Sequence, residues 1–157
     1  MEQQRIDNSN RALINAFLKK HWFSTTMVLR GKEIDMTKAD GFYFSEEGAI
    51  VGLITYTVYD ATLEILSLDS LREKQGIGSA LLARVIREAR ALGLAKILLI
   101  TTNDNIEAMR FYQKRGFDMA HLYHDALDAA RKLKPAIPLI GAHGIPLRHE
   151  IEFELPL

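Results

Sequence analysis

The chain has 157 residues, of which 48% are hydrophobic and 25% are charged, as is typical of a folded globular protein and not of a disordered one. Twenty basic and twenty acidic residues give a formal net charge of zero, which argues against an extended nucleic-acid or anionic-membrane surface. The absence of cysteine excludes disulfides, a thiolate nucleophile and cysteine-based metal sites.

The sequence also gives an expectation for the cellular location. Residues 1–7 have no apolar core of a secretory signal, and the apolar run around residues 97–100 is far too short to span a bilayer. We therefore expect a cytoplasmic protein with no membrane partner. Residues 1–157 contain no repeat, linker or low-complexity segment, so a single domain is expected to account for all of them.

The N-terminal part is predicted to form one helix and one strand. Residues 8–20 place apolar side chains on one helical stripe, and Asn8 or Ser9 is available as the N-cap. Residues 24–30 hold β-branched and apolar residues and are predicted to form a strand. Residues 31–40 are polar and are predicted to be a loop.

Three strands joined by short turns are predicted next, over residues 41–45, 49–59 and 62–68. Consecutive strands with such short connections form an antiparallel meander. On the third strand, the period of two places Glu64 on the same side as Leu66 and Leu68.

The apolar period then changes from two to that of a helix. Apolar residues recur at helical spacing from Ile77 to Leu92, and Gly93 suits the position that ends a helix. Residues 96–102 are predicted to form a strand, and their apolar run at 97–100 is typical of a strand buried on both faces. This strand–helix–strand order predicts a parallel right-handed crossover. A helix over residues 106–115, a strand over 117–123, a helix over 125–133 and a terminal strand over 150–155 complete an α+β fold.

The stretch between the third strand and the long helix has the features of an anion site. Gly76 and Gly78 let a ligand approach the backbone, and the N–H groups at the start of a helix attract phosphate. Two familiar phosphate loops do not fit, because Leu81 stands where a dinucleotide fingerprint has its third glycine and no Gly-Lys-Ser/Thr follows. From this loop alone, a plain strand–helix turn is equally compatible.

A second stretch, Asn105 to Phe117, has the pattern Asn-x-x-Ala-x-x-Phe-Tyr-x-x-x-Gly-Phe. Together the two stretches resemble the GNAT superfamily of acetyl-CoA-dependent N-acetyltransferases, the first being similar to its pyrophosphate motif Arg/Gln-x-x-Gly-x-Gly/Ala. The resemblance extends over about residues 41–123. It implies a GNAT-like central mixed sheet, in which an antiparallel meander is followed by a parallel β-α-β crossover, with helices on both faces.

The resemblance also implies how acetyl-CoA, the expected co-substrate, is held. The backbone of Leu66 and Leu68 is expected to pair with the pantetheine arm, and the Leu68 N–H to polarise the thioester carbonyl. Asn105 is expected to contact the pantetheine, and Tyr112 to protonate the leaving thiolate, although a tyrosine that only packs would fit the same position. The pyrophosphate is expected on backbone N–H groups of Lys74, Gln75, Gly76, Ile77, Gly78 and Ser79.

One residue departs from the pyrophosphate motif. Glu73 stands where the family usually has arginine or glutamine, and its carboxylate is unfavourable beside a pyrophosphate unless it points away. Arg72 and Lys74 flank it and can compensate. At the end of the second motif, Lys114 and Arg115 are within reach of the CoA phosphates or are simply cations at a helix C-terminus.

The acceptor side is less specified. An amine must be neutral to attack a thioester, so a base is needed, and Glu64 is the predicted base, with Asp69 and a terminal-strand glutamate as weaker candidates. Trp22, at the end of the first helix, is a candidate for the wall of the acceptor pocket or a core residue. The histidines are scattered along the sequence, so no metal site is predicted.

The predicted function is transfer of acetyl from acetyl-CoA to a primary amine of a small molecule or peptide by direct attack, with Tyr112 as general acid. The alternative is a non-catalytic acyl-CoA-binding or sensing module of the same fold. No nucleic-acid partner is expected. Residues 124–149 are longer than a hairpin needs, which leaves open an acceptor-side lid, a homodimer contact or a packed loop.

Overall fold

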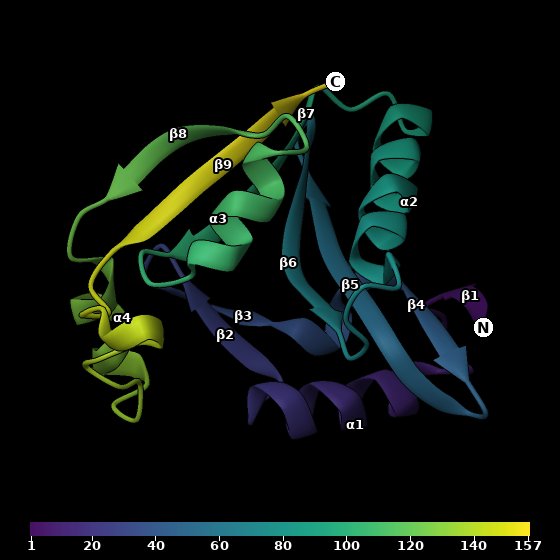
Figure 1. Ribbon diagram of the computed structural model, residues 1–157, viewed down its shortest axis with the longest axis horizontal. Helices are drawn as coiled ribbons and strands as arrows, with labels where there is room; N and C mark the ends of the chain where they lie inside the picture. The colour runs from purple at the N-terminus through teal and green to yellow at the C-terminus, as the bar shows by residue number, and fades with distance from the viewer. The chain divides into compact units, whose positions relative to one another are not determined.

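The computed structural model describes residues 1–157 (Figure 1). These residues divide into two compact units. The first unit comprises Met1–Thr26, Asp35–Ile97 and Leu157, and the second comprises Met27–Ile34 and Leu98–Pro156. The expectation that one domain accounts for the whole chain stays a prediction. None of the helices combines the length and the apolar character that crossing a bilayer requires.

The first unit contains an antiparallel sheet with the strand order β1-β4-β5-β6. The predicted meander is confirmed, since its three strands are β4, β5 and β6 in this order. Strand β1 was not predicted, because its four residues are all exposed and carry no apolar alternation. The elements of this unit are β1 (Glu2–Arg5), α1 (Arg11–Trp22), η1 (Met36–Lys38), β4 (Asp40–Glu46), β5 (Ala49–Tyr59), β6 (Thr62–Ser70) and α2 (Ile77–Ala91).

Helices α1 and α2 pack on opposite faces of this sheet. A Cβ on Gly52 of β5 would lie 2.3 Å from Ile77 Cγ2, so α2 covers the face to which Gly52 belongs. The next pair across the strands, Leu53 and Asp69, points to the other face, because successive residues of a strand alternate. The Trp22 indole of α1 donates a hydrogen bond to Asp69, which places α1 on that second face.

A β-bulge on β6 changes the faces that the sequence predicted. Thr55 pairs with Ser67, but the next residue of β5, Tyr56, pairs with Ile65, so Leu66 is the extra residue. Beyond the bulge Glu64 pairs with Thr57, which lies on the same face of β5 as Thr55. The prediction that Glu64 shares a face with Leu66 and Leu68 is therefore wrong, because strict alternation is interrupted at Leu66.

The second unit contains strands in the order β7-β9-β8, with β8 and β9 antiparallel and side by side (Figure 1). Its elements are β2 (Thr26–Leu29), β3 (Lys32–Asp35), β7 (Lys96–Thr102), α3 (Ile106–Gln113), β8 (Asp118–Tyr123), α4 (Ala126–Leu133), η2 (Ala142–Gly144) and β9 (Glu150–Pro156), and the first residues of β2 and β7 and the last of β3 belong to the first unit. The α+β class and the predicted succession β6-α2-β7 are confirmed.

Two N-terminal expectations need correction. Residues 32–35 form a strand that pairs with β2, where a loop was predicted, because backbone pairing with a neighbour stabilises this polar segment despite its lack of apolar alternation. Helix α1 begins at Arg11 and not at residue 8, because the Asp7 carboxylate accepts hydrogen bonds from the backbone of Ser9 and Asn10 and fixes a turn there.

The segment over residues 124–149 is at least in part a packed loop. Leu127 and Ala130 of α4 form a small core with Leu147, and Ile137 packs against it. The Arg131 guanidinium donates to the carbonyl of Pro138 at 2.8 Å, which ties the helix to the following loop. A role of this segment in a homodimer stays a prediction.

The contact of α2 with Gly52 predicts a cost for any side chain at this position. Gly52→Ala places a methyl group in the space of Ile77 and should lower the free energy of unfolding by about 1–3 kcal/mol. Thermal denaturation is expected to show a fall of roughly 2–4 °C for each kcal/mol. Ala49→Val, at an exposed position of the same strand, is the matched control, and an equal change in both variants would contradict the prediction.

Candidate functional site

The loop before α2 presents backbone N–H groups to one space. Lys74 and Gly76 have positive φ values of 59° and 70°, with a residue of negative φ between them, and such an alternation forms an anion-binding concavity. The first backbone hydrogen bond of α2 runs from Ala80 N–H to the Gly76 carbonyl, and no side chain caps the helix. The N–H groups of Ile77 and Gly78 therefore have no acceptor within the chain, as a bound phosphate requires.

The bulge lies where the sequence predicts binding of an extended ligand. Leu66 has no partner on β5, whereas Leu68, two residues on, pairs with Ile54. A bulge of this kind bends the strand and frees backbone groups from the ladder. These residues fit the pantetheine arm of CoA, which carries amide groups able to pair like a strand.

The residue that departs from the family motif, Glu73, is exposed and makes no ion pair. Arg72, which was expected to compensate for it, forms an ion pair with Glu46 of β4 instead. Lys74 is the remaining cation beside it and makes no ion pair. The expected compensation is therefore reduced to Lys74.

Glu64 is buried to 1% exposure within the face of the sheet that α1 covers. Its carboxylate accepts a hydrogen bond of 2.9 Å from the Tyr59 hydroxyl, at the turn end of the β5–β6 hairpin. On the same face the Thr55 and Ser67 hydroxyls are hydrogen-bonded at 2.6 Å.

Asp69 ends this row of polar residues. Its Oδ2 accepts a hydrogen bond of 3.0 Å from the Trp22 indole N–H, so the structure brings together a predicted pocket residue and a candidate base. Burial raises the pKa of the Asp69 carboxyl above its ordinary value, and this outweighs the lowering by the Trp22 hydrogen bond and by His21.

In the second unit, Asn105 and Tyr112 lie at opposite ends of α3. The Asn105 side chain accepts a hydrogen bond from the Ala108 N–H and caps the helix, while its amide nitrogen makes no hydrogen bond in the chain. Tyr112 is only 6% exposed, and its ring packs edge-on against Phe111 and Phe117. Tyr112 therefore takes the buried position on this helix, whereas Phe111 is only half-buried.

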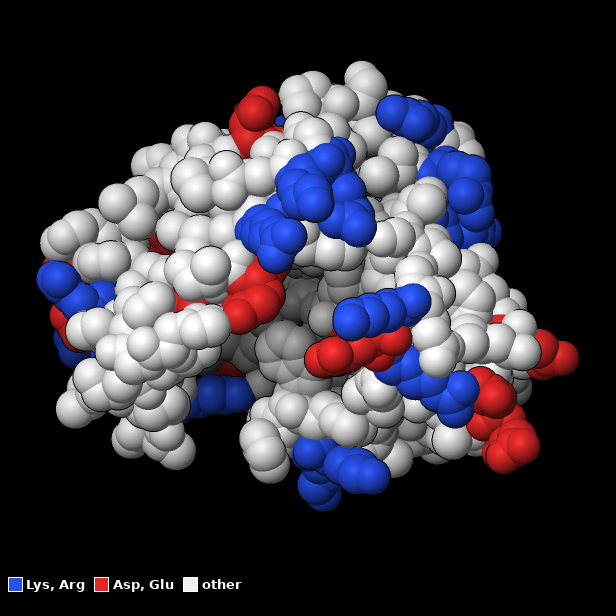
Figure 2. Space-filling model, in the orientation of Figure 1, with Lys and Arg blue, Asp and Glu red and all other residues white.

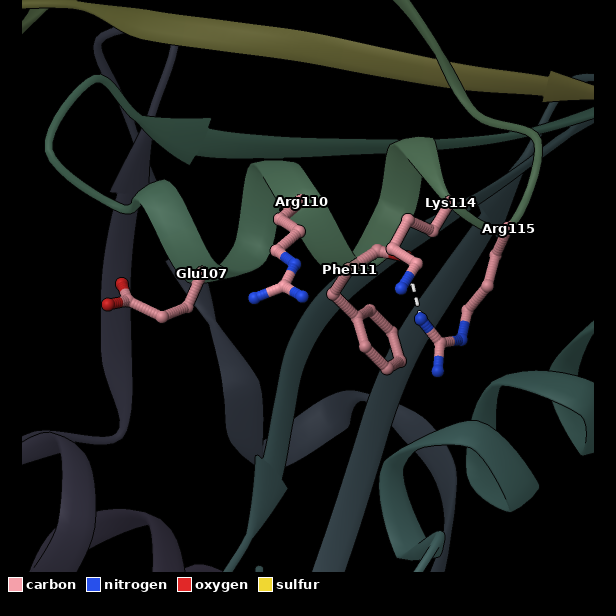
Figure 3. Close-up of a pocket in the computed structure, with 5 residues that line it drawn as sticks. All are labelled: Glu107, Arg110, Phe111, Lys114 and Arg115. Atoms are coloured by element: carbon pink, nitrogen blue, oxygen red, sulfur yellow. Dashed lines mark hydrogen bonds between the residues drawn. The ribbon is translucent and has the colours of Figure 1, made fainter. Parts of the chain in front are cut away.

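A basic pocket on α3 extends what the sequence suggested for Lys114 and Arg115. Figure 2 shows basic side chains gathered over this helix, and Figure 3 shows those of Arg110, Lys114 and Arg115 on the same side as the Phe111 ring. They line a pocket of about 230 Å³ together with Glu107. The Arg115 guanidinium lies 3.7 Å from the centroid of the Phe111 ring. Arg110 was missed, although its spacing of four residues from Lys114 is the signal for a shared helix face.

The predicted site residues are thus distributed between the two units. The first unit contains the loop at Lys74–Ser79, the bulge at Leu66, Leu68, Glu64 and Trp22, and the second unit contains Asn105 and Tyr112.

The histidines are less scattered than the sequence indicated. His124, Asp125 and His149 place possible metal-ligand atoms within 4.8 Å of one another. However, His149 Nδ1 accepts the Asp125 backbone N–H at 2.8 Å, and the Asp125 carboxylate is bonded to Arg148. Hydrogen bonds within the chain already use these atoms, so the cluster serves the turn before α4.

Comparison with known proteins identifies the family. The profile of the Acetyltransferase (GNAT) family matches residues 9–117. The uncharacterized protein YxbD of Bacillus subtilis is 44% identical over 140 residues, which cover 88% of each chain.

Solved structures share the fold at low sequence identity. An acetyltransferase of Bacillus subtilis in complex with CoA superposes with a TM-score of 0.71 at 19% identity, covering 99% of this chain and 98% of that one. A GNAT family acetyltransferase of Elizabethkingia anophelis with acetyl-CoA bound gives the same TM-score and identity, covering 99% and 97%. The predicted GNAT fold is confirmed. The chain therefore belongs to the GNAT acetyltransferase family and is a transferase.

Proposed function

We propose that this protein transfers the acetyl group of acetyl-CoA to a primary amine of a small molecule or peptide in the cytoplasm. The observation that carries the proposal is the combination, within one unit, of the uncapped N-terminus of α2, the positive-φ loop before it and the bulge at Leu66. The loop and the helix N-terminus suit a phosphate, the bulge suits the pantetheine arm, and all three lie between the start of β6 and the first turn of α2.

When bound, acetyl-CoA supplies an acetyl group activated as a thioester. The N–H groups from Lys74 to Ser79 hold its pyrophosphate by charge-assisted hydrogen bonds, each contributing about 1.5–3 kcal/mol. Leu66 and Leu68 align its pantetheine arm through backbone groups, and the Leu68 N–H stabilises the negative charge that develops on the carbonyl oxygen. Asn105 contributes its free amide nitrogen to the pantetheine.

Proton transfer requires an acid and a base. Tyr112 is the acid, and it donates its phenolic proton to the leaving thiolate. A carboxylate on the α1 face of β6 is the base, and Glu64 is the one that the sequence predicted. The burial of Tyr112 among Phe111 and Phe117 fixes the ring, which supports a defined position for its hydroxyl.

The basic pocket on α3 supports a further contact with the same co-substrate. CoA has a 3′-phosphate beside its adenine ring, and three cations around the Phe111 ring are chemically suited to a phosphate and an aromatic base. We assign Lys114 to this phosphate because it makes no ion pair of its own.

Thiol release from acetyl-CoA tests the proposed function. The wild-type protein is expected to release CoA in the presence of an amine from a broad panel, and Tyr112→Phe should reduce kcat by about 100-fold or more while keeping acetyl-CoA affinity. Tyr123→Phe, in the same unit, is the matched control. Binding of acetyl-CoA without turnover on any amine would instead indicate the acyl-CoA-binding module, and full activity of Tyr112→Phe at every pH would exclude this residue as the acid.

The assignment of Lys114 is tested with CoA and with dephospho-CoA, which lacks the 3′-phosphate. Lys114→Gln should weaken CoA binding about 5-fold at low salt, as expected for an exposed ion pair worth roughly 1 kcal/mol, and leave dephospho-CoA binding unchanged. Isothermal titration calorimetry measures both constants, with Lys132→Gln on α4 as control. Equal weakening for the two ligands would show that Lys114 does not contact this phosphate.

A further inference from the structure

The end of α1 exposes aromatic side chains beside a carboxylate. Trp22 is 38% exposed although its indole N–H is hydrogen-bonded, and the following residue, Phe23, is 91% exposed. Phe23 also has a φ of 59°, a left-handed conformation that costs an ordinary L-residue roughly 1–2 kcal/mol. The left-handed position ends α1, but it does not require an aromatic side chain, and a ring this exposed adds nothing to the core. An exposed aromatic residue at such a position is the pattern expected of a residue that serves a ligand.

The Asp69 carboxylate has one oxygen left for that ligand. Oδ2 is bonded to Trp22, whereas Oδ1 makes no hydrogen bond in the structure. The residue opposite on β5, Leu53, is apolar, and besides the Trp22 hydrogen bond only His21 of α1 lowers the pKa of Asp69. Removal from water raises the pKa of the Asp69 carboxyl, which makes it a stronger base than an ordinary aspartate.

Asp69 is also better placed than Glu64 for the proposed reaction. It directly follows Leu68, whose N–H is the proposed contact of the thioester carbonyl, while Glu64 is four residues further back and across the bulge. Glu64 is also 1% exposed and already hydrogen-bonded to Tyr59. Both carboxylates lie on the α1 face, but Glu64 is buried, whereas Asp69 has an oxygen without a hydrogen bond and is bonded through the other to the exposed Trp22 at the end of α1.

We propose that Asp69, Trp22 and Phe23 form the acceptor site, which takes a primary amine carried on an apolar or aromatic hydrocarbon, and that Asp69 is the base for that amine. The inference rests on the proposed function and specifies its acceptor. The ammonium group binds Oδ1 of Asp69, and the hydrocarbon covers the Trp22 and Phe23 rings, with a cation–π contribution from the indole.

The proton balance of the transfer follows from these positions. The ammonium gives one proton to Asp69, and the neutral nitrogen forms the C–N bond to the thioester carbonyl carbon. Collapse of the tetrahedral adduct breaks the C–S bond. The leaving thiolate takes up one proton from Tyr112, and the nitrogen gives its second proton to the resulting phenolate as the amide forms, which restores Tyr112. The proton on Asp69 is released to solvent, so that each turnover yields amide, CoA thiol and one free proton.

Trp22 is the one tryptophan of the chain, so its fluorescence reports on this site directly. Titration with 2-phenylethylamine in the presence of CoA is expected to change the emission with saturation, and 2-phenylethanol, its neutral counterpart, to bind at least 10-fold more weakly. Asp69→Asn keeps an acceptor for the indole N–H and should abolish this discrimination. Equal binding of the two compounds by the wild-type protein would overturn the proposal.

The pH profile of 2-phenylethylamine acetylation tests the role of Asp69 in catalysis. Activity requires the carboxylate, so it should be lost as the pH falls through the raised pKa of Asp69. Trp22→Phe removes a hydrogen bond that lowers this pKa and should move the acidic limb to higher pH, whereas Asp69→Asn should remove the limb and reduce kcat about 100-fold. A limb that disappears in Glu64→Gln and persists in Asp69→Asn would identify Glu64 as the base and overturn the assignment.

Phe23→Asn is expected to affect stability and acceptor binding in opposite directions. Asparagine tolerates the left-handed conformation, so the variant should unfold at the same or a higher temperature while KM for 2-phenylethylamine rises several-fold. Unchanged KM would remove Phe23 from the site. Turnover by the wild-type protein on carboxylate-bearing amines but not on 2-phenylethylamine would overturn the acceptor class alone, whereas no thiol release with any amine would contradict the proposed function itself.

Discussion

The bulge at Leu66 is the constraint on which the arrangement of the first unit depends. Side chains of a strand alternate between the two faces of the sheet. One extra residue on β6 therefore puts the residues before it, such as Glu64, on the face opposite to the one that strict alternation predicts. It leaves Leu66 out of the ladder with β5 and places Glu64, Ser67 and Asp69 on one face. A single local irregularity thus provides both the free backbone for an extended ligand and the row of polar groups beneath α1.

The close packing of α2 on β5 is the second constraint on this unit. Gly52 has no side chain, so Ile77 packs directly on β5 and the first turn of α2 lies close to the end of β6. The N–H groups at the uncapped start of α2 therefore lie close to β6, the strand that carries the bulge. The two faces of the sheet thus have different roles. Helix α2, with its proposed phosphate-binding end, covers one face, and α1 with Trp22 covers the other.

Electrostatics refine the chemistry that the motifs suggest. The pairing of Arg72 with Glu46 removes one of the two cations expected to offset Glu73, so the backbone has to supply most of the attraction for a pyrophosphate in this loop. On the α1 face, Glu64 is buried and hydrogen-bonded to Tyr59. Asp69 has one oxygen without a hydrogen bond, and desolvation raises its pKa, so Asp69 is the carboxylate better suited to accept a proton.

The sequence by itself determined the meander, the helix after the glycine loop, the α+β class and the family, because period, turn residues and the two motifs are local properties of the chain. It did not predict β1 and β3, which are polar and become strands only by pairing with neighbours. Only the tertiary structure decided the face of Glu64, the burial of Tyr112 beside the pocket-lining Phe111, and the contact of Trp22 with Asp69. These depend on register and packing between segments up to 47 residues apart, which no local pattern encodes.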